Sequence, residues 1–449
     1  MFTIKRILKN SPYNKVTILL FLLVSFGFPT AVKIVVPLFI VVTFFQFYQV
    51  LKNKITIDYL LETYFYLLVY SLIFFRSIHT LILVFNLIFY FYYTLKSKEK
   101  LKVSALKNEF LIFFFFCLII VNQLIFQPYL KTIDTYLYLL FYPLLFFLIK
   151  KNKIHFTIEN TLKAFIISVL VATLYLIFIN LFQGTLTLKT NTFFAEPLDL
   201  THVYFGLFLG AAFSFVLILL EKEAYFINKI STYFLLSIFI IVLIYNGART
   251  SLIATFMIFG VFLFKKIPLV FYKKITLLSV LFFMFFTISF KTIPRVKQDL
   301  FFIKKVYVSV TTNDTEDLIQ NSWRNIYQRF LVTKYTVNEI KENLFLGVGN
   351  HNIKKILGEK IHKDGYVYFE AINPHNQYLH VLLGMGLLSF LYFLVMMANF
   401  FKMPTSHIYF LLFFILIMFT ESVLVRVKGI SVFFLFALIL SLKKRPLYD

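Results

Sequence analysis

Long apolar runs alternate with short polar and basic connections along almost the whole chain. Most runs approach the ~20 residues that an α-helix needs to cross the hydrocarbon core of a bilayer. Because backbone polar groups must be satisfied within that core, the runs predict a bundle of membrane-spanning helices. The predicted spans are 16–31, 33–51, 57–75, 77–95, 110–128, 132–149, 160–183, 200–220, 228–245, 250–264, 272–290, 375–399, 405–424 and 429–442. Since the first, tenth and last are short, we expect an all-α integral membrane protein with about 12–14 transmembrane helices.

One connection, residues 291–374, is far longer than the others and carries a pattern of its own. Its segment "NSWRNIYQRFLVTKYTVNEIKENLFLGVG" predicts a helix with a cap signal at Asn321 and Ser322 and an end near Gly347. Arg329 borders the apolar stripe of this helix and Arg324 lies nearly opposite it. The stripe consists of Trp323, Ile326, Tyr327, Phe330, Val337, Ile340 and Leu344. An amphipathic helix of this kind is expected to lie on or near a membrane surface.

Composition and charge strengthen the membrane interpretation. The chain is 60% hydrophobic and 15% charged, whereas soluble domains are usually ~25% charged. A net charge of +24 could indicate nucleic-acid binding, but the basic residues cluster in every second connection. Examples are "KSKEKLKVSALK", "KKIPLVFYKK" and the final "KKRPLYD". The positive-inside rule therefore predicts that both termini are cytoplasmic and that 291–374 lies on the opposite side.

Several classes of site are excluded by the sequence. Cys117 is the only cysteine and lies within an apolar run, so disulfides and thiolate metal sites are excluded. There is no phosphate-binding glycine loop, dinucleotide turn or HExxH motif. No Asp-x-Asp pair, the usual metal motif of nucleotide-sugar transferases, occurs in a connection. We therefore expect no cofactor and no metal, and any donor on the outer side would already be lipid-linked, with arginines at its phosphates.

Charged residues lie at the outer ends of two predicted spans, the ninth and the thirteenth. Arg249 lies just after the glycine of "IYNGART". An arginine that snorkels from a helix end to the membrane surface explains this position as well as a binding role does. Glu421 and Arg426 lie in "FTESVLVRVKG" and can be interfacial residues or an ion pair. These residues alone do not establish a site.

A histidine at the start of the twelfth span is the best candidate for chemistry. In "INPHNQYLHVLLGMGLL", Pro374 suits a first helical turn and Asn373 is the expected cap. His375 would then lie in the first turn, where the helix dipole favours neutral imidazole. A neutral imidazole at a membrane boundary can serve as a general base for a hydroxyl group. From this stretch alone, a histidine that only satisfies a helix end is the simpler interpretation.

Three stretches resemble, in order and spacing, the motifs of the O-antigen ligase and polymerase family. These motifs are a Gly-Ser-Arg-Thr type helix end, an outer-loop helix leading to an "NPLFGVG" turn, and an "HNxYLxxLxxxG" helix start. The matching stretches are "NGARTSLIA", "RFLVTKYTVNEIKENLFLGVGNHN" and "PHNQYLHVLLGMGLLSF". "FTESVLVRVKGISVFF" also resembles the Glu-containing C-terminal stretch of the family. Ala248 and Leu344 depart from the usual Ser and Pro, but neither change removes a charged group.

The resemblance implies a role for each matched residue. His375 would act at the acceptor hydroxyl, while Arg249 and Arg329 would hold the donor diphosphate, with Arg324 as the second choice for the loop arginine. Asn376, Tyr378 and Glu421 would support them. The fold would be GT-C-like, with N-terminal transmembrane helices over 1–199 and a catalytic region over 200–449 that includes the periplasmic loop 291–374.

The resemblance also implies partners and a location. The donor would be a glycan on undecaprenyl diphosphate, and the acceptor a glycan or lipid A-core, at the periplasmic face of a bacterial inner membrane. Membrane lipid would surround the protein, and no nucleic acid is expected. A repeat-unit polymerase of the same family shares this donor, so it stays open. A lipid-linked oligosaccharide transporter would instead require charges within the spans and repeated halves.

Overall fold

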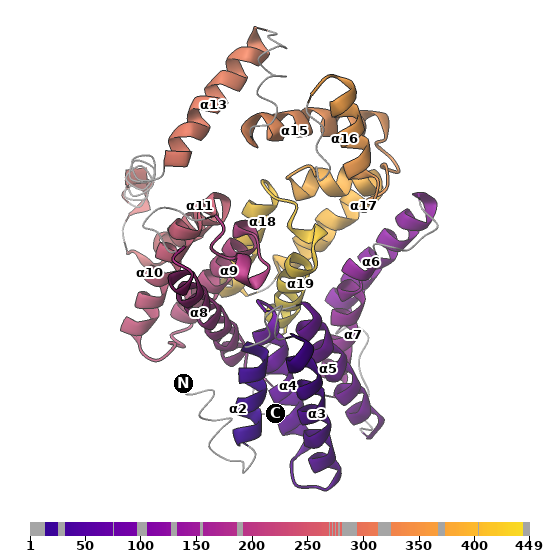
Figure 1. Ribbon diagram of the computed structural model, residues 1–449, viewed down its shortest axis with the longest axis vertical. Coiled ribbons are helices and arrows are strands. Elements are labelled where there is room, and N and C mark those ends of the chain that lie inside the picture. Colours follow the sequence, from indigo (N-terminus) through magenta and orange to yellow (C-terminus); the bar gives the residue numbers. More distant parts are fainter. Residues whose placement is uncertain are drawn as a thin grey trace.

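The computed structural model (Figure 1) describes most of the chain as helices. It covers residues 14–25, 32–74, 76–96, 106–126, 133–152, 156–185, 192–268, 294–312, 325–366, 373–402 and 404–442, with isolated residues between 270 and 280. Every regular element within these residues is helical. The predicted all-α class is thereby confirmed.

The helices of the first half occupy the predicted apolar runs. They are α2 (Asn14–Ser25), α3 (Val32–Leu51), α4 (Ile57–Ser71), α5 (Arg76–Lys96), α6 (Lys107–Phe126), η2 (Ile133–Thr135), α7 (Tyr138–Lys151), α8 (Ile158–Phe182) and η3 (Glu196–Leu198). α4 begins at a threonine cap, since the side chain of Thr56 accepts a hydrogen bond from Tyr59 N.

The second half adds the remaining spans and three helices of the long connection. They are α9 (His202–Glu221), α10 (Lys229–Asn246), α11 (Arg249–Lys266), α13 (Pro294–Thr311), α15 (Asn325–Glu342), α16 (Ile353–Lys363), α17 (Gln377–Phe400), η4 (Thr405–His407), α18 (Ile408–Met418), η5 (Val423–Val425) and α19 (Val427–Ser441).

Eight of the described helices are long and apolar enough to cross a membrane, and α2, α18 and α19 are apolar but shorter. The chain is thus a multi-pass membrane protein of the predicted type. Every predicted span except one coincides with a helix. The exception, 272–290, lies mostly outside the described residues.

Ion pairs join the connections at one end of the bundle. Lys150, at the end of α7, pairs with Glu109 at the start of α6, with 2.6 Å between Nζ and Oε1. Lys265, at the end of α11, pairs with Glu221 at the end of α9 across 3.6 Å. This is the end that the positive-inside count assigns to the cytoplasm.

A second set of ion pairs joins the opposite end. Arg76, at the start of α5, lies 2.8 Å from Asp134, just before α7. Arg329 of α15 lies 2.6 Å from Glu421, which follows α18. These ion pairs lie at two opposite ends of the bundle. The described residues of the long connection that contact Glu421 belong to the second end, called the outer end below.

Helix α9 lies at the centre of the C-terminal half and is buried along almost its whole length. Two glycines allow neighbours to approach it closely. A side chain at Gly206 would overlap Ala248 and Ser251 at the start of α11, and one at Gly210 would overlap the ring of Phe413 in α18. The outer part of α9 is thus packed directly against the turn that carries Arg249.

The long connection has a small hydrophobic core of its own. Tyr327 and Leu331 of α15, Leu357 and Ile361 of α16, and Leu383 of α17 are all buried in it. The predicted helix corresponds to α15, whose expected cap at Asn321 and Ser322 lies outside the described residues, as do Trp323 and Arg324. Residues 343–347 lie in a turn beyond the end of α15 at Glu342, so the expected end near Gly347 is too late.

The predicted stripe of α15 is only partly correct. Tyr327 and Ile340 are buried, but Val337 is 38% exposed. Instead Leu331, Val332 and Tyr335 complete the buried face, because α15 packs against α13, α16 and α17 on more than one side.

Candidate active site

His375 lies in a tight turn immediately before α17. Its backbone has φ 48°, in the left-handed region that few residues other than glycine adopt. The side chain of Asn373 accepts a hydrogen bond from His375 N across 2.9 Å, which closes the turn. Strained backbone conformations of this kind are common at functional sites.

The predicted cap of this helix is wrong by three residues. Asn376, not Asn373, is the N-cap of α17, and its Oδ1 accepts hydrogen bonds from Tyr378 N and Leu379 N. His375 therefore precedes the helix instead of lying in its first turn. Both asparagines can cap, but Asn373 is used to close the turn, so the helix begins only at Gln377.

A buried carboxylate joins His375 to an arginine from the outer loop. His375 Nδ1 lies 3.3 Å from Glu421 Oε2. The other oxygen of Glu421 accepts a hydrogen bond from Arg329 Nη2 at 2.6 Å, and Arg329 Nη1 donates to Thr420 O at 3.0 Å. Three segments distant in sequence, α15, the start of α17 and the end of α18, thus meet at one carboxylate.

The environment keeps Glu421 ionised. Burial on its own would raise the pKa of this carboxyl, but the hydrogen bond with His375 and the charge and hydrogen bond of Arg329 outweigh burial, so the pKa of Glu421 lies below its ordinary value. The interpretation of Glu421 and Arg426 as an ion pair is not supported, because the partners of Glu421 among the described residues are Arg329 and His375.

The residues after His375 fix the segment that carries Glu421. Asn376 Nδ2 donates to Phe419 O at 3.0 Å, and Gln377 Oε1 accepts from Leu424 N at 2.7 Å. The ring of Tyr378 lies against that of Phe419, with 4.8 Å between centroids. Asn376 and Tyr378 therefore hold the two halves of the cluster together, as supporting residues would.

A break in α17 holds the outer loop in place. At Gly386 the backbone has φ 74°, and the freed groups bond to the turn after α15. Val348 N donates to Leu383 O at 2.8 Å, and Leu387 N donates to Leu344 O at 2.8 Å. The "NLFLGVGN" stretch is thus anchored to the helix that follows His375, which fixes α15 and Arg329 relative to the histidine.

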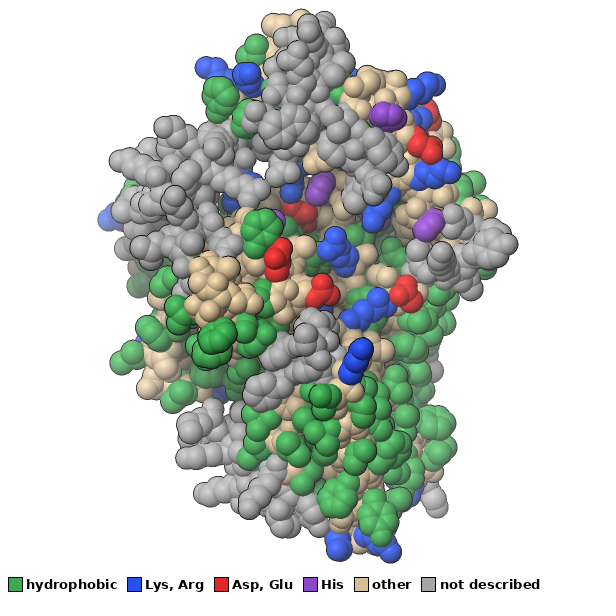
Figure 2. Space-filling model, viewed as in Figure 1, with side chains coloured by type: hydrophobic (Ala, Val, Ile, Leu, Met, Phe, Trp, Pro, Cys, Tyr) green, Lys and Arg blue, Asp and Glu red, His purple; other side chains and the backbone are tan. Residues whose placement is uncertain are grey.

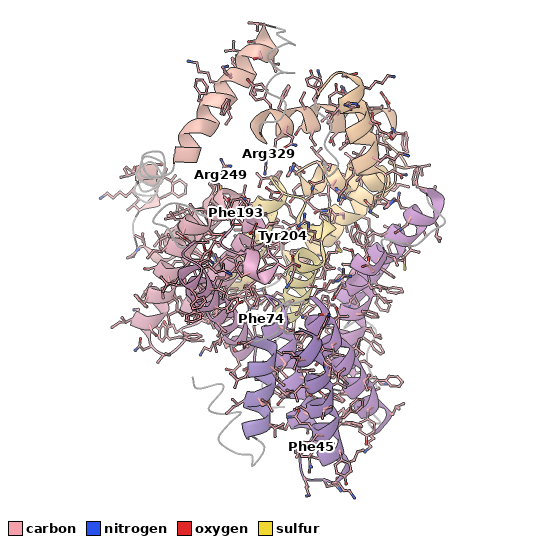
Figure 3. The ribbon with its side chains drawn as sticks, in the orientation of Figure 1. Phe45, Phe74, Phe193, Tyr204, Arg249 and Arg329 are labelled. Atoms are coloured by element: carbon pink, nitrogen blue, oxygen red, sulfur yellow. The ribbon has the colours of Figure 1, made fainter. Side chains whose placement is uncertain are left out.

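Arg249 lies at the same outer end, at the first position of α11. α10 ends at Asn246, and its C-cap Gly247 has a φ of 67°, which allows the sharp turn into α11. The close packing at Gly206 places this turn against α9, and Figure 3 shows Arg249 and Arg329 at the same end of the molecule. Arg249 therefore lies at the same end of the molecule as the cluster around Glu421.

Arg426 is a cation that sequence reasoning did not select. Its guanidinium lies 5.3 Å from the centroid of the Tyr204 ring, and Tyr204 Oη donates to Val423 O at 3.4 Å. In the described part of the chain Arg426 makes no salt bridge. The only sequence signal for it was its position five residues after Glu421.

The charged groups form a distinct region of the surface. Figure 2 shows charged side chains and histidines gathered in a band across one face, with hydrophobic side chains covering the surface below it. Arg324, the second choice for the loop arginine, lies outside the described residues.

Comparison with known proteins gives the family. Residues 232–394 match the family model described as O-antigen ligase, and no curated protein matches the chain. The matched segment includes Arg249, Arg329 and His375 and ends before Glu421. The resemblance seen in the three motifs is thereby confirmed, and residues 232–394 form a domain of the O-antigen ligase family.

Proposed function

We propose that the protein is an O-antigen ligase-like glycosyltransferase. It moves a glycan from undecaprenyl diphosphate to a hydroxyl of a lipid A-core acceptor at the periplasmic face of the inner membrane. The observation that carries this proposal is the cluster in which His375 and Arg329 share the carboxylate of Glu421 at the outer end. The family match supports the same reaction class.

His375 is the proposed general base. Its Nδ1 faces Glu421, so the carboxylate fixes the ring and favours a proton on Nδ1. Nε2 is then the nitrogen that can accept a proton from the acceptor hydroxyl. The side chain is 32% exposed, so a substrate hydroxyl can approach it.

The reaction exchanges one carbon–oxygen bond for another and moves one proton. The acceptor oxygen attacks the anomeric carbon of the donor sugar, and the bond from that carbon to the phosphate oxygen breaks. The hydroxyl proton passes to His375, and undecaprenyl diphosphate leaves with the bonding electrons. Because Glu421 is ionised, it stabilises the imidazolium that forms.

Arginines are proposed to offset the charge that develops on the leaving diphosphate. Arg249 and Arg329 are the cations that the family motifs indicate, and guanidinium groups match phosphate oxygens well. Arg329 already donates to Glu421 and Thr420, so it also positions the carboxylate. Arg426, which has no carboxylate partner within the described region, is proposed as a third cation for the diphosphate.

The orientation is part of the proposal. The end that holds Lys150 and Lys265 would face the cytoplasm, with both termini, and the end that holds His375 would face the periplasm. A lipid-linked donor in the outer leaflet would then present its diphosphate near the charged band of Figure 2.

Deletion of the gene tests the proposed reaction. A ligase deletion should remove all long glycan chains from lipid A-core, while polymer accumulates on undecaprenyl diphosphate. A deletion strain that still attaches a single repeat unit to the core would instead indicate the polymerase. Unchanged surface glycan and unchanged lipid-linked intermediates would contradict both activities.

A further inference from the structure

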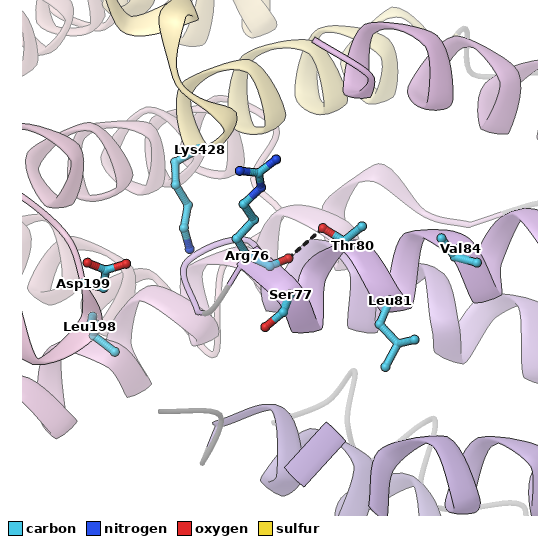
Figure 4. Close-up of a pocket in the computed structure, with 8 residues that line it drawn as sticks. All are labelled: Arg76, Ser77, Thr80, Leu81, Val84, Leu198, Asp199 and Lys428. Carbon is cyan, nitrogen blue, oxygen red and sulfur yellow. Dashed lines mark hydrogen bonds between the residues drawn. The ribbon is translucent and has the colours of Figure 1, made fainter. Parts of the chain in front are cut away.

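A pocket lies where the start of α5 meets the start of α19. Its volume is about 660 Å³, and it is lined by Arg76, Ser77, Thr80, Leu81, Val84, Leu198, Asp199 and Lys428 (Figure 4). Five of these residues form one face of α5, from position 76 to position 84. At 1.5 Å per residue this face runs roughly 12 Å along the helix, away from the outer end.

The polarity of the pocket changes along its length. The end of the pocket at the start of α5, called its mouth here, carries Arg76, Asp199 and Lys428, whereas the wall further along α5 carries Leu81 and Val84. Val84 is 39% exposed, on a helix that is a candidate membrane span. A site with charged groups at the membrane boundary and aliphatic groups below suits an amphiphile. A sugar would require more hydrogen-bonding groups along that wall.

The mouth carries two cations, Arg76 and Lys428, and one carboxylate, Asp199. Arg76 is already paired with Asp134, so it adds little charge for a ligand. Lys428 donates to Leu72 O at 3.1 Å and to Phe74 O. Since an ammonium group has three donors, one of them remains for a ligand.

Asp199 supplies the opposite charge. It faces Lys428 across the pocket mouth (Figure 4) and makes no salt bridge to any described residue. A head group that carries both a phosphate and an amine would satisfy Lys428 and Asp199 together.

We propose that this pocket binds a zwitterionic glycerophospholipid of the surrounding membrane. One acyl chain would lie along Leu81 and Val84 of α5, the phosphate would meet Lys428, and the head-group amine would donate to Asp199. Lys428 is in the first turn of α19, two residues after Arg426. The bound lipid would therefore brace the start of α19, next to the segment that carries Glu421. The site does not depend on the proposed transferase reaction.

Native mass spectrometry of the purified protein tests the site. The probes are phosphatidylethanolamine, phosphatidylglycerol and undecaprenyl phosphate, each added at the same concentration in mild detergent. Wild type should retain phosphatidylethanolamine about tenfold better than phosphatidylglycerol, as expected for one extra charge-assisted hydrogen bond. Val84→Trp fills the pocket and should reduce retention of phosphatidylethanolamine by about tenfold or more.

Two further variants make the test specific. Val121→Trp on α6 is the matched control, because Val121 is 53% exposed and does not line the pocket; it should retain lipid like wild type. Asp199→Asn should lose the preference for phosphatidylethanolamine over phosphatidylglycerol. If Val84→Trp and Val121→Trp retain phosphatidylethanolamine equally, the lipid does not bind in this pocket. A preference of wild type for undecaprenyl phosphate would overturn the proposed occupant and assign the pocket to a lipid-linked substrate.

Discussion

Glu421 is the residue that makes the proposed site cooperative. One oxygen faces His375 and the other accepts from Arg329, so a change at Glu421 disturbs both partners at once. Removal of one partner leaves a charged group without its counterion, which costs more than the pair itself contributes. The residues of the cluster should therefore behave as a unit in mutational tests.

Replacing Glu421 should reduce transfer strongly. Glu421→Gln keeps the size of the side chain but removes the charge that orients His375 and stabilises its protonated form. We expect the transfer rate to fall by about 10²–10⁴-fold, the range for loss of positioned acid–base catalysis, measured with lipid-linked donor and purified acceptor. Glu421→Asp should retain part of the activity. A Glu421→Gln enzyme with the wild-type rate would remove Glu421 from the proposed mechanism.

The ionisation of Glu421 should also be visible in stability. Because its pKa in the folded protein lies below the ordinary 4.5, the carboxylate stabilises the fold above that value, and the stabilisation is lost as the pH falls through the lowered folded pKa. The Tm of wild type should exceed that of Glu421→Gln at pH 7, and the difference should shrink below pH 4.5. A Tm difference that stays constant into strong acid would contradict this account.

Arg426 provides a separate residue-scale test. Arg426→Gln should lower the transfer rate by about 10²–10³-fold, by analogy with the loss of one donor to a developing oxyanion. Its matched control is Arg76→Gln, which removes the same charge at the same end from an arginine paired with Asp134. Equal rates for the two variants would show that Arg426 does not contact the leaving group.

At the scale of elements, the break in α17 couples the outer loop to the histidine. Gly386 has φ 74°, and a side chain there would overlap the backbone at Phe345 and Leu346. The turn after α15 is held on its other side by α6, because Asn122 Nδ2 donates to Leu346 O at 3.3 Å. Arg329 is therefore fixed through two helices that are remote from it in sequence.

Gly386→Ala should loosen this attachment. We expect a lower Tm and a lower transfer rate, because the added methyl group displaces the turn and with it α15. Gly184→Ala is the matched control, since Gly184 also has positive φ, 66°, but a side chain there meets nothing within 4 Å. The Tm loss of Gly184→Ala therefore measures only the cost of placing a side chain in this backbone conformation. If both variants lose the same Tm, the contact with the turn contributes nothing.

Local patterns predicted the elements better than their ends. The apolar runs located the membrane helices because burial in lipid imposes a long, simple signal. They did not reveal α13 or α16, which are amphipathic and not membrane spans, or the choice of Asn376 over Asn373 as the cap of α17. That choice depends on a turn at His375, which nothing in the hydrophobic pattern specifies.

At the scale of the whole molecule, the family motifs predicted which residues approach one another. Arg329 and His375 were matched from the motifs, and they meet at Glu421. The position of Arg426 over Tyr204 and the pocket at Lys428 were not predictable. They depend on the packing of α19 against α7 and α9, between segments too far apart in sequence to leave a local pattern.

The orientation of the bundle can be tested with single cysteines in a Cys117→Ser background. Lys355, on α16, is at the proposed periplasmic end, and Lys402, after α17, is at the proposed cytoplasmic end. In cells with a permeabilised outer membrane, an impermeant maleimide should label Lys355→Cys. It should label Lys402→Cys only after the inner membrane is opened. The reverse result would place His375 in the cytoplasm and exclude a periplasmic acceptor.

The transfer rate of His375→Ala is the most direct test of the central claim. The purified variant is compared with His351→Ala, which removes an exposed histidine from the same outer loop, using lipid-linked glycan and lipid A-core. His375→Ala should lower the rate by about 10²–10⁴-fold while its Tm stays near that of wild type, and His351→Ala should react like wild type. A folded His375→Ala protein that transfers glycan at the wild-type rate would contradict the account.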